Sequence, residues 1–321
     1  MKKLLSVLLV LLVLVGCTSK GESNPEKVYK IGVLQLVDHP SLQATYDGLI
    51  EELNELIGED GYTVELLNAQ GDANNTTMMA QKLVDDGVDL IYAIATPAAQ
   101  AVYAAAEQDK IPVVFNAVTD PVDAGLADAM DKPGNHATGV SDVAPIDIQL
   151  KLIKDMLPEA KNVGILYNTG EDNSRVQIEI ATKEAEKLGL TIIKQGVSSA
   201  TEIEDATTQL LAKVDAIYNI TDNMIVNATS QVVSLANTAN IPVFAAEDGQ
   251  IDLGILATDS IDYKNLGRLG GQVVKEILVD GKKPADVAVK TVTETVLYIN
   301  VDVAEKLNIT IPEDILVRNK R

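Results

Sequence analysis

The sequence has few of the side chains that most metal-dependent and covalent chemistry requires. Cys17 is the single cysteine among 321 residues, which excludes an intramolecular disulfide, a cysteine-rich zinc site and an iron–sulfur cluster. The two histidines, His39 and His136, leave little material for a histidine metal site or a catalytic triad. Tryptophan is absent, and aromatic residues make up only 3% of the chain. We therefore expect no metal and no cofactor.

The chain is also short of positive charge. It has 26 lysine and arginine residues against 47 aspartate and glutamate residues, a formal net charge of −21. Such a surface repels phosphate backbones, so we expect no nucleic-acid partner. The sequence lacks a Gly-x-Ser-x-Gly elbow, a His-Glu-x-x-His pair and a Walker glycine loop. The protein is therefore not expected to be an enzyme.

The first 17 residues form a segment of their own. Lys2 and Lys3 precede an apolar run from Leu4 to Val15, a pattern typical of a secretion signal. The run is shorter than the about 20 residues that a membrane-spanning helix needs. Leu14-Val15-Gly16-Cys17 resembles the bacterial lipobox, in which cleavage precedes the cysteine and its sulfur receives a diacylglycerol.

This pattern predicts a signal peptide at 1–16, lipidation of Cys17 and a polar tether at 17–27. The protein would then be anchored by lipid to the outer face of the bacterial cytoplasmic membrane, in an extracellular or periplasmic location. The alternative is an ordinary signal peptide or an anchor helix with an incidental cysteine.

From Val28 onward, short β-branched runs alternate with helical patterns, as in parallel sheets covered by helices on both faces. Three segments of the first half recur in the same order in the second half: Ile31–Leu34 as Val163–Leu166, Val88–Tyr92 as Val214–Tyr218, and Ile111–Val113 as Ile241–Val243. A repeat of this length predicts an α/β fold of two similar, doubly wound parallel-sheet lobes joined by a hinge.

The chain beyond Ile261 is too short for a third domain. It shows one helical pattern over Tyr263–Val279 and two strand-like runs, Val287–Val292 and Val296–Asn300. We expect this part to cross back between the lobes. The first lobe then comprises 28–141 and about 262–289, and the second comprises 142–261 and about 290–321.

Candidate binding residues follow from this architecture, because ligands of parallel α/β sheets bind beyond the carboxyl ends of the strands. The candidates at these ends are His39, Ser41, Thr96, Ala98, Thr119 and Asp142 in the first half of the chain, and Tyr167, Asn173, Asp222 and Asn223 in the second.

Several of these candidate residues have more than one possible role. Thr96, followed by proline, either caps a helix or donates its hydroxyl to a ligand carboxylate. Asp222 either caps a helix or pairs with a ligand ammonium in a closed cleft. Asp142 is a cap, an interlobe hinge or a ligand contact, and His39 contacts the ligand or supports a residue that does. Tyr167 is either a flat wall of the site or part of the core.

Seven segments carry a resemblance to a known family: Ile31–Gln35, His39–Leu42, Ile94–Gln100, Thr119–Pro121, Thr138–Asp142, Glu171–Ser174 and Asp222-Asn223. With these segments the chain resembles the type I periplasmic-binding-protein fold. More closely, it resembles the substrate-binding lipoproteins of ABC transporters related to tryptophan and other aromatic amino-acid binders.

The resemblance implies capture of a small zwitterion, an amino acid, in the interlobe cleft by a monomer that serves an ABC permease and its ATPase. It implies Thr96 and Thr119 as donors to the ligand carboxylate and Asp222 as the ammonium partner. The remaining implied cleft residues are Asn223, Asp142, Asn173 and Ser41. A sugar- or nucleoside-binding protein of the same fold, and a sensor or adhesion lipoprotein without transport, remain alternatives.

Overall fold

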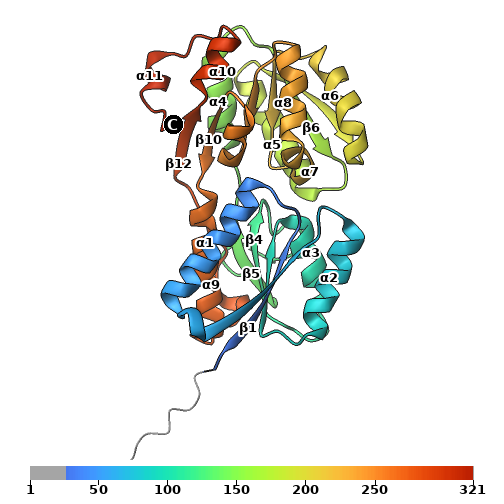
Figure 1. The fold of residues 1–321 in the computed structure, drawn as a ribbon, viewed down its shortest axis with the longest axis vertical. Helices are drawn as coiled ribbons and strands as arrows, with labels where there is room; N and C mark the ends of the chain where they lie inside the picture. Colours follow the sequence, from blue (N-terminus) through green and yellow to red (C-terminus); the bar gives the residue numbers. More distant parts are fainter. Residues whose placement is uncertain (1–26, 321) are drawn as a thin grey trace, which may run out of the picture.

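Residues 27–320, which the computed structural model describes, form two lobes that follow one another along the long axis of the molecule (Figure 1). Each lobe is built on a six-stranded sheet. The predicted signal peptide, Cys17 and residues 17–26 of the predicted tether lie outside the described residues. None of the helices within 27–320 is long and apolar enough to span a bilayer.

The sheet of the first lobe has the strand order β11-β5-β4-β3-β1-β2, with all neighbours parallel. Its strands are β1 (Tyr29–Gln35), β2 (Tyr62–Asn68), β3 (Leu90–Ile94), β4 (Val113–Val118), β5 (Ala137–Ser141) and β11 (Lys290–Thr291). Its helices are α1 (Pro40–Leu56), α2 (Ala73–Asp85), α3 (Thr96–Ala106) and α9 (Tyr263–Leu278), with 3-10 turns at η1 (Glu59–Gly61) and η4 (Pro284–Asp286).

The sheet of the second lobe has the equivalent order, β12-β10-β9-β8-β6-β7. Its strands are β6 (Asn162–Asn168), β7 (Thr191–Val197), β8 (Ala216–Asn219), β9 (Val243–Ala245), β10 (Ala257–Ile261) and β12 (Thr295–Ile299). Its helices are α4 (Ile146–Met156), α5 (Asp172–Lys187), α6 (Ile203–Leu211), α7 (Asn223–Asn227), α8 (Thr229–Thr238), α10 (Val301–Lys306) and α11 (Glu313–Leu316), with 3-10 turns at η2 (Ala200–Glu202) and η3 (Asp248–Leu253).

The internal repeat in the sequence corresponds to equivalent strands. The three recurring segments fall on or beside β1 and β6, β3 and β8, and β4 and β9, which occupy the same places in the two sheets. Each lobe has its own apolar interior. The β3 residues are all buried, as expected for a strand that helices cover on both faces.

The final part of the chain differs in two details from the predicted pattern. Strand β12 runs antiparallel to β10, so the second sheet is not wholly parallel. The predicted strand over Val287–Val292 is reduced to β11, which pairs with β5. Residues 290 and 291 therefore belong to the first sheet, whereas the predicted boundary assigned them to the second lobe. The pairing of an edge strand depends on register, which periodicity does not reveal.

Helix α9 returns from the second lobe and packs along α1, as the neighbouring blue and orange helices in Figure 1 show. A Cβ atom at Gly48 would lie 2.0 Å from the Lys264 carbonyl oxygen, and one at Gly267 would lie 2.0 Å from the Thr45 carbonyl oxygen. The two helices thus touch through their backbones. This contact fixes α1, whose N-terminus lies at the second lobe.

Candidate functional site

The carboxyl ends of the strands in the two lobes face each other, and the lobes touch. The Thr119 and Thr221 hydroxyl oxygens are 3.4 Å apart across the interface. On another side, Gln100 Nε2 donates a hydrogen bond to Asp172 Oδ2 at 2.9 Å. These contacts define a closed arrangement.

A cavity of about 530 Å³ lies between the lobes. The first lobe contributes the lining residues Leu36, Val37, Gln70, Gly71, Asp72, Ala73, Thr76, Thr77, Pro97 and Ala101, and the second contributes Asn168, Gly170, Glu171, Ser198, Ala200, Asn223, Met224 and Asn227. Leu36, Val37, Thr76, Glu171 and Asn223 are the buried residues of this lining, whereas most of its other polar residues are exposed. Ligand sites for small molecules commonly combine apolar walls with a few oriented polar groups in this way.

Glu171 is the buried carboxyl group of this lining. Its Oε2 accepts hydrogen bonds from Asn223 Nδ2 at 2.6 Å, from the Asn223 backbone N–H at 3.1 Å and from Asn173 Nδ2 at 3.0 Å. Its Oε1 accepts longer ones from Met224 N–H and Asn168 Nδ2. These donors hold the Glu171 carboxyl group in one orientation at the wall of the cavity.

Asp222 accepts three hydrogen bonds from protein donors. Its Oδ1 accepts from the Ile225 N–H at 3.0 Å, which is the N-cap of α7. Its Oδ2 accepts from the Asn168 N–H at 2.5 Å and from Ser174 Oγ at 2.7 Å. Burial, and secondarily Glu171, raise the pKa of Asp222 to about 7. The cap, one of its two predicted roles, is present in the structure, and Asp222 does not line the cavity. Its role as the ammonium partner stays a prediction.

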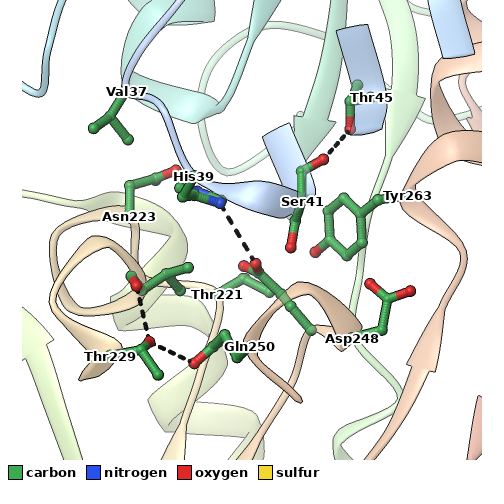
Figure 2. Close-up of polar contacts among 12 residues, drawn as sticks. Val37, His39, Ser41, Thr45, Thr221, Asn223, Thr229, Asp248, Gln250 and Tyr263 are labelled. Atoms are coloured by element: carbon green, nitrogen blue, oxygen red, sulfur yellow. Dashed lines mark hydrogen bonds and ion pairs between the residues drawn. The ribbon is translucent and has the colours of Figure 1, made fainter. Parts of the chain in front are cut away.

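Two other predicted residues, His39 and Ser41, face the end of β9 across the lobe interface. His39 Nδ1 lies 3.9 Å from Glu247 Oε2, and Gly249 packs against Ser41. Burial lowers the pKa of His39 to about 4, so the ring is neutral. Burial raises the pKa of Glu247 to about 8. Figure 2 shows His39 beside Asn223 and Ser41 beside Tyr263, so this buried polar layer adjoins the residues that hold Glu171.

Thr119 and Asp142 lie where the chain first crosses between the lobes. Thr119 Oγ1 donates to Asp142 Oδ1 at 3.3 Å, and the Tyr263 hydroxyl, at the second crossing, donates to Asp142 Oδ2 at 3.1 Å. Burial raises the pKa of Asp142 to about 6. Asp142 thus links two of the interlobe connections, in agreement with the hinge interpretation.

Thr96 and Ala98 form the buried first turn of α3, beside the cavity residue Pro97. Ala95, just before this turn, has a φ of 85°, a conformation that non-glycine residues adopt mainly where the surrounding structure enforces it. Thr96 Oγ1 is buried and has no hydrogen-bond partner. A hydroxyl and free N–H groups at a helix N-terminus form a suitable seat for an anion.

The last two candidates, Asn173 and Tyr167, lie in different surroundings. Asn173 Nδ2 donates to Glu171 and to the Thr221 carbonyl oxygen, while its Oδ1 is buried without a partner. Tyr167 packs on the core of the second lobe and against Gly196, so it does not form a wall of the cavity.

Of the ten predicted binding residues, only Asn223 lines the cavity itself; the others lie behind it, at the hinge or in the core. The sequence analysis missed Glu171, Leu36, Val37 and Met224. Glu171 belongs to the segment Glu171–Ser174, which the sequence analysis had noted. Its position directly before a helix was the signal that could have identified it as a candidate. Within 27–320, no group of three histidine, cysteine, aspartate or glutamate side chains is arranged to hold a metal ion.

Comparisons with known proteins agree with this geometry. A model of the family described as ABC transporter substrate binding protein matches residues 30–321. The chain is 38% identical over 322 residues to a tyrosine-binding protein of Clostridioides difficile (strain R20291), covering 96% of this chain and 92% of that protein.

Two solved structures are also similar to this chain. A complex with L-Trp from Streptococcus pneumonia is 38% identical and has a TM-score of 0.88, covering 92% of this chain and 99% of that one. A ligand-free, open substrate binding protein with adhesive properties from Clostridium difficile is 37% identical, with a TM-score of 0.68 and coverages of 89% and 97%. The identities are nearly equal, and the TM-score is higher with the L-Trp complex than with the ligand-free, open structure.

The two-lobed type I periplasmic-binding-protein architecture predicted from the sequence is thus confirmed. Family members are solute-binding proteins that act outside the cytoplasmic membrane with a permease and an ATPase. On the strength of a match over nearly its whole length, the chain belongs to the ABC transporter substrate binding protein family.

Proposed function

We propose that this protein captures an aromatic L-amino acid in the interlobe cavity and presents it to an ABC permease. The observation that carries the proposal is Glu171, a buried carboxyl group held by N–H donors on the wall of the interlobe cavity. Related proteins are described as binding tyrosine and L-Trp, which supports the choice of ligand class.

The ligand ammonium would lie at Glu171, where a fixed negative charge in a water-poor site interacts strongly with a cation. The carboxylate would lie at the N-terminus of α3 near Thr96, whose hydroxyl lacks a partner. No lysine or arginine lines the cavity, so hydroxyl and backbone N–H groups would neutralise this end.

The side chain would occupy the aliphatic part of the cavity between Leu36, Val37, Pro97 and Met224. No aromatic residue lines this space, so the ligand ring would contact aliphatic groups and a thioether instead of stacking on another ring. The layer of His39, Ser41, Thr119 and Asp142 would form the polar floor of the closed site.

The absence of tryptophan makes a direct test practical, because the fluorescence of added L-tryptophan has no protein tryptophan background. We expect saturable fluorescence changes with L-tryptophan, and heat of binding with L-tyrosine. Tryptamine, which lacks the carboxylate, and indole-3-propionate, which lacks the ammonium, should each bind at least about tenfold more weakly, because one charged seat stays empty. Equal binding of either analogue, or tighter binding of pentoses or nucleosides, would refute the proposal.

We also propose that the protein is a monomer without catalytic activity of its own, held at the membrane by lipid on Cys17. Metabolic labelling with a radioactive fatty acid tests the anchor. The wild-type protein should carry label and sediment with membranes, and Cys17→Ser should do neither. Label retained in the variant would exclude Cys17 as the modified residue.

A further inference from the structure

The first turn of α5 carries two side chains that reach across to the first lobe. Asp172 Oδ2 accepts the hydrogen bond from Gln100 Nε2 at 2.9 Å. One turn on, the Arg175 guanidinium pairs with Asp123 Oδ2 and also contacts Glu179 Oε1 at 3.3 Å on its own helix. Both cross-lobe partners lie on one side of the interface, on or next to α3.

The loop that presents Asp123 is held by hydrogen bonds within the first lobe. Asp120 Oδ1 accepts hydrogen bonds from the Val122 and Asp123 backbone N–H groups, each at 3.0 Å. The Ala124 N–H donates to the Asp120 carbonyl oxygen at 2.9 Å. Gln100 Nε2 then joins this loop to α5, because it also donates to the Ala124 carbonyl oxygen at 3.2 Å.

These contacts adjoin the wall of the cavity. On α3, Gln100 precedes the lining residue Ala101, and on the second lobe Gly170 and Glu171 precede Asp172. Separation of the lobes on this side would therefore open the cavity next to its carboxyl group. Arg175 is also one of four arginines in a chain of net charge −21, so its positive charge offsets repulsion between two acidic lobes.

We propose that Arg175, paired with Asp123 and supported by the Gln100–Asp172 hydrogen bond, is a latch that sets how long the ligand remains bound. Arg175 is a positioning residue: it lies outside the cavity lining and acts by holding the lobes together. This proposal depends on the proposed function only in the choice of ligand for the dissociation experiment. Since the contacts exist only when the lobes are closed, they slow dissociation more than they change association.

The test is a charge exchange. Arg175→Glu and Asp123→Arg should each speed dissociation of L-tryptophan about fivefold, the upper range for a partly exposed ion pair. The double variant carrying both changes should return to within about twofold of the wild type. Dissociation is followed by tryptophan fluorescence after mixing with excess L-tyrosine, at low salt and again at about 1 M salt. The differences in dissociation rate between the variants and the wild type should be smaller at the high salt concentration.

Lys183→Glu is the matched control, since it makes the same charge change at an exposed position two turns further along α5. It should leave the dissociation rate unchanged. The latch is refuted if Arg175→Glu behaves like this control, or if the double variant is no slower in dissociation than the single ones.

A second experiment tests the latch without any ligand. Small-angle X-ray scattering of the ligand-free protein should give a larger radius of gyration for Arg175→Glu than for the wild type, and the double variant should reverse the increase. Identical profiles for the wild type and Arg175→Glu would refute the latch. If the wild type binds neither amino acid, the proposed function fails while this experiment still decides the latch.

Discussion

The Ser174 hydroxyl donates a hydrogen bond to Asp222 Oδ2 at 2.7 Å, which ties the first turn of α5 to the cap of α7. The Asn168 N–H donates to the same oxygen, so β6 joins the connection. One carboxyl group thus positions both the β6–α5 loop, which carries Glu171, and the start of α7, which carries Asn223.

Asp222→Ala should therefore destabilise the protein by about 3 kcal/mol, since three buried donors lose their acceptor. Chemical denaturation followed by circular dichroism measures the loss. Asp205→Ala, an exposed acid on α6, serves as the control and should cost less than about 0.5 kcal/mol. Normal stability of Asp222→Ala with abolished amino-acid binding would instead restore Asp222 as a ligand contact.

Glu171→Gln should weaken amino-acid binding at least about tenfold while the fold is retained, because glutamine keeps the shape but not the charge that the ammonium requires. Isothermal titration with L-tyrosine and L-tryptophan gives the affinity. Glu186→Gln, at an exposed position near the C-terminal end of α5, makes the same chemical change far from the cavity and should bind as the wild type does. Unchanged affinity in Glu171→Gln would remove this residue from the site.

Stability should fall as the pH rises from about 7 to about 8, because of Glu247. Burial raises its pKa from the ordinary 4.5 to about 8, so across this interval the folded protein holds a proton that the unfolded chain has released. This contribution is fully present below about 4.5 and is lost through pH 8. His39, whose folded pKa is about 4 against an ordinary 6.5, has the opposite effect only below 6.5.

The expected loss from Glu247 between pH 7 and pH 8 is about 1 kcal/mol in the free energy of unfolding, with a smaller part from Asp222. Urea titrations at the two pH values measure it. Glu247→Gln should flatten the dependence, because its amide does not titrate. A wild type whose stability rises over this interval would show that Glu247 is ionised in the folded state.

Gly267→Ala should destabilise the protein by about 2 kcal/mol or more, because the new methyl group meets the Thr45 carbonyl oxygen and forces α1 and α9 apart. Thermal denaturation is the measurement. Asn265→Ala, exposed on the same helix, controls for the change in helix propensity and should have little effect. A neutral Gly267→Ala would mean that the two helices can separate without cost.

The position of Glu171 illustrates what sequence reasoning could not reach. Both Asp222 and Glu171 are acids beside a helix start in the second lobe, and nothing in the sequence separates them. Only the folded chain shows that Glu171 lines the cavity whereas Asp222, which caps α7, does not. Tyr167 is similar, since its strand position allowed both a wall and a core residue until packing against Gly196 decided it.

The sequence by itself determined the two-lobed architecture, because buried parallel strands demand continuous apolar runs and the duplicated pattern repeats these runs in the same order. Asn223 and the strand-end positions around it followed from that architecture. The tertiary structure alone decided which side chains face the cavity, where β11 and β12 pair, and which residues meet across the lobes. These features depend on register, side-chain direction and contacts between distant segments, and local patterns of polarity carry no information about them.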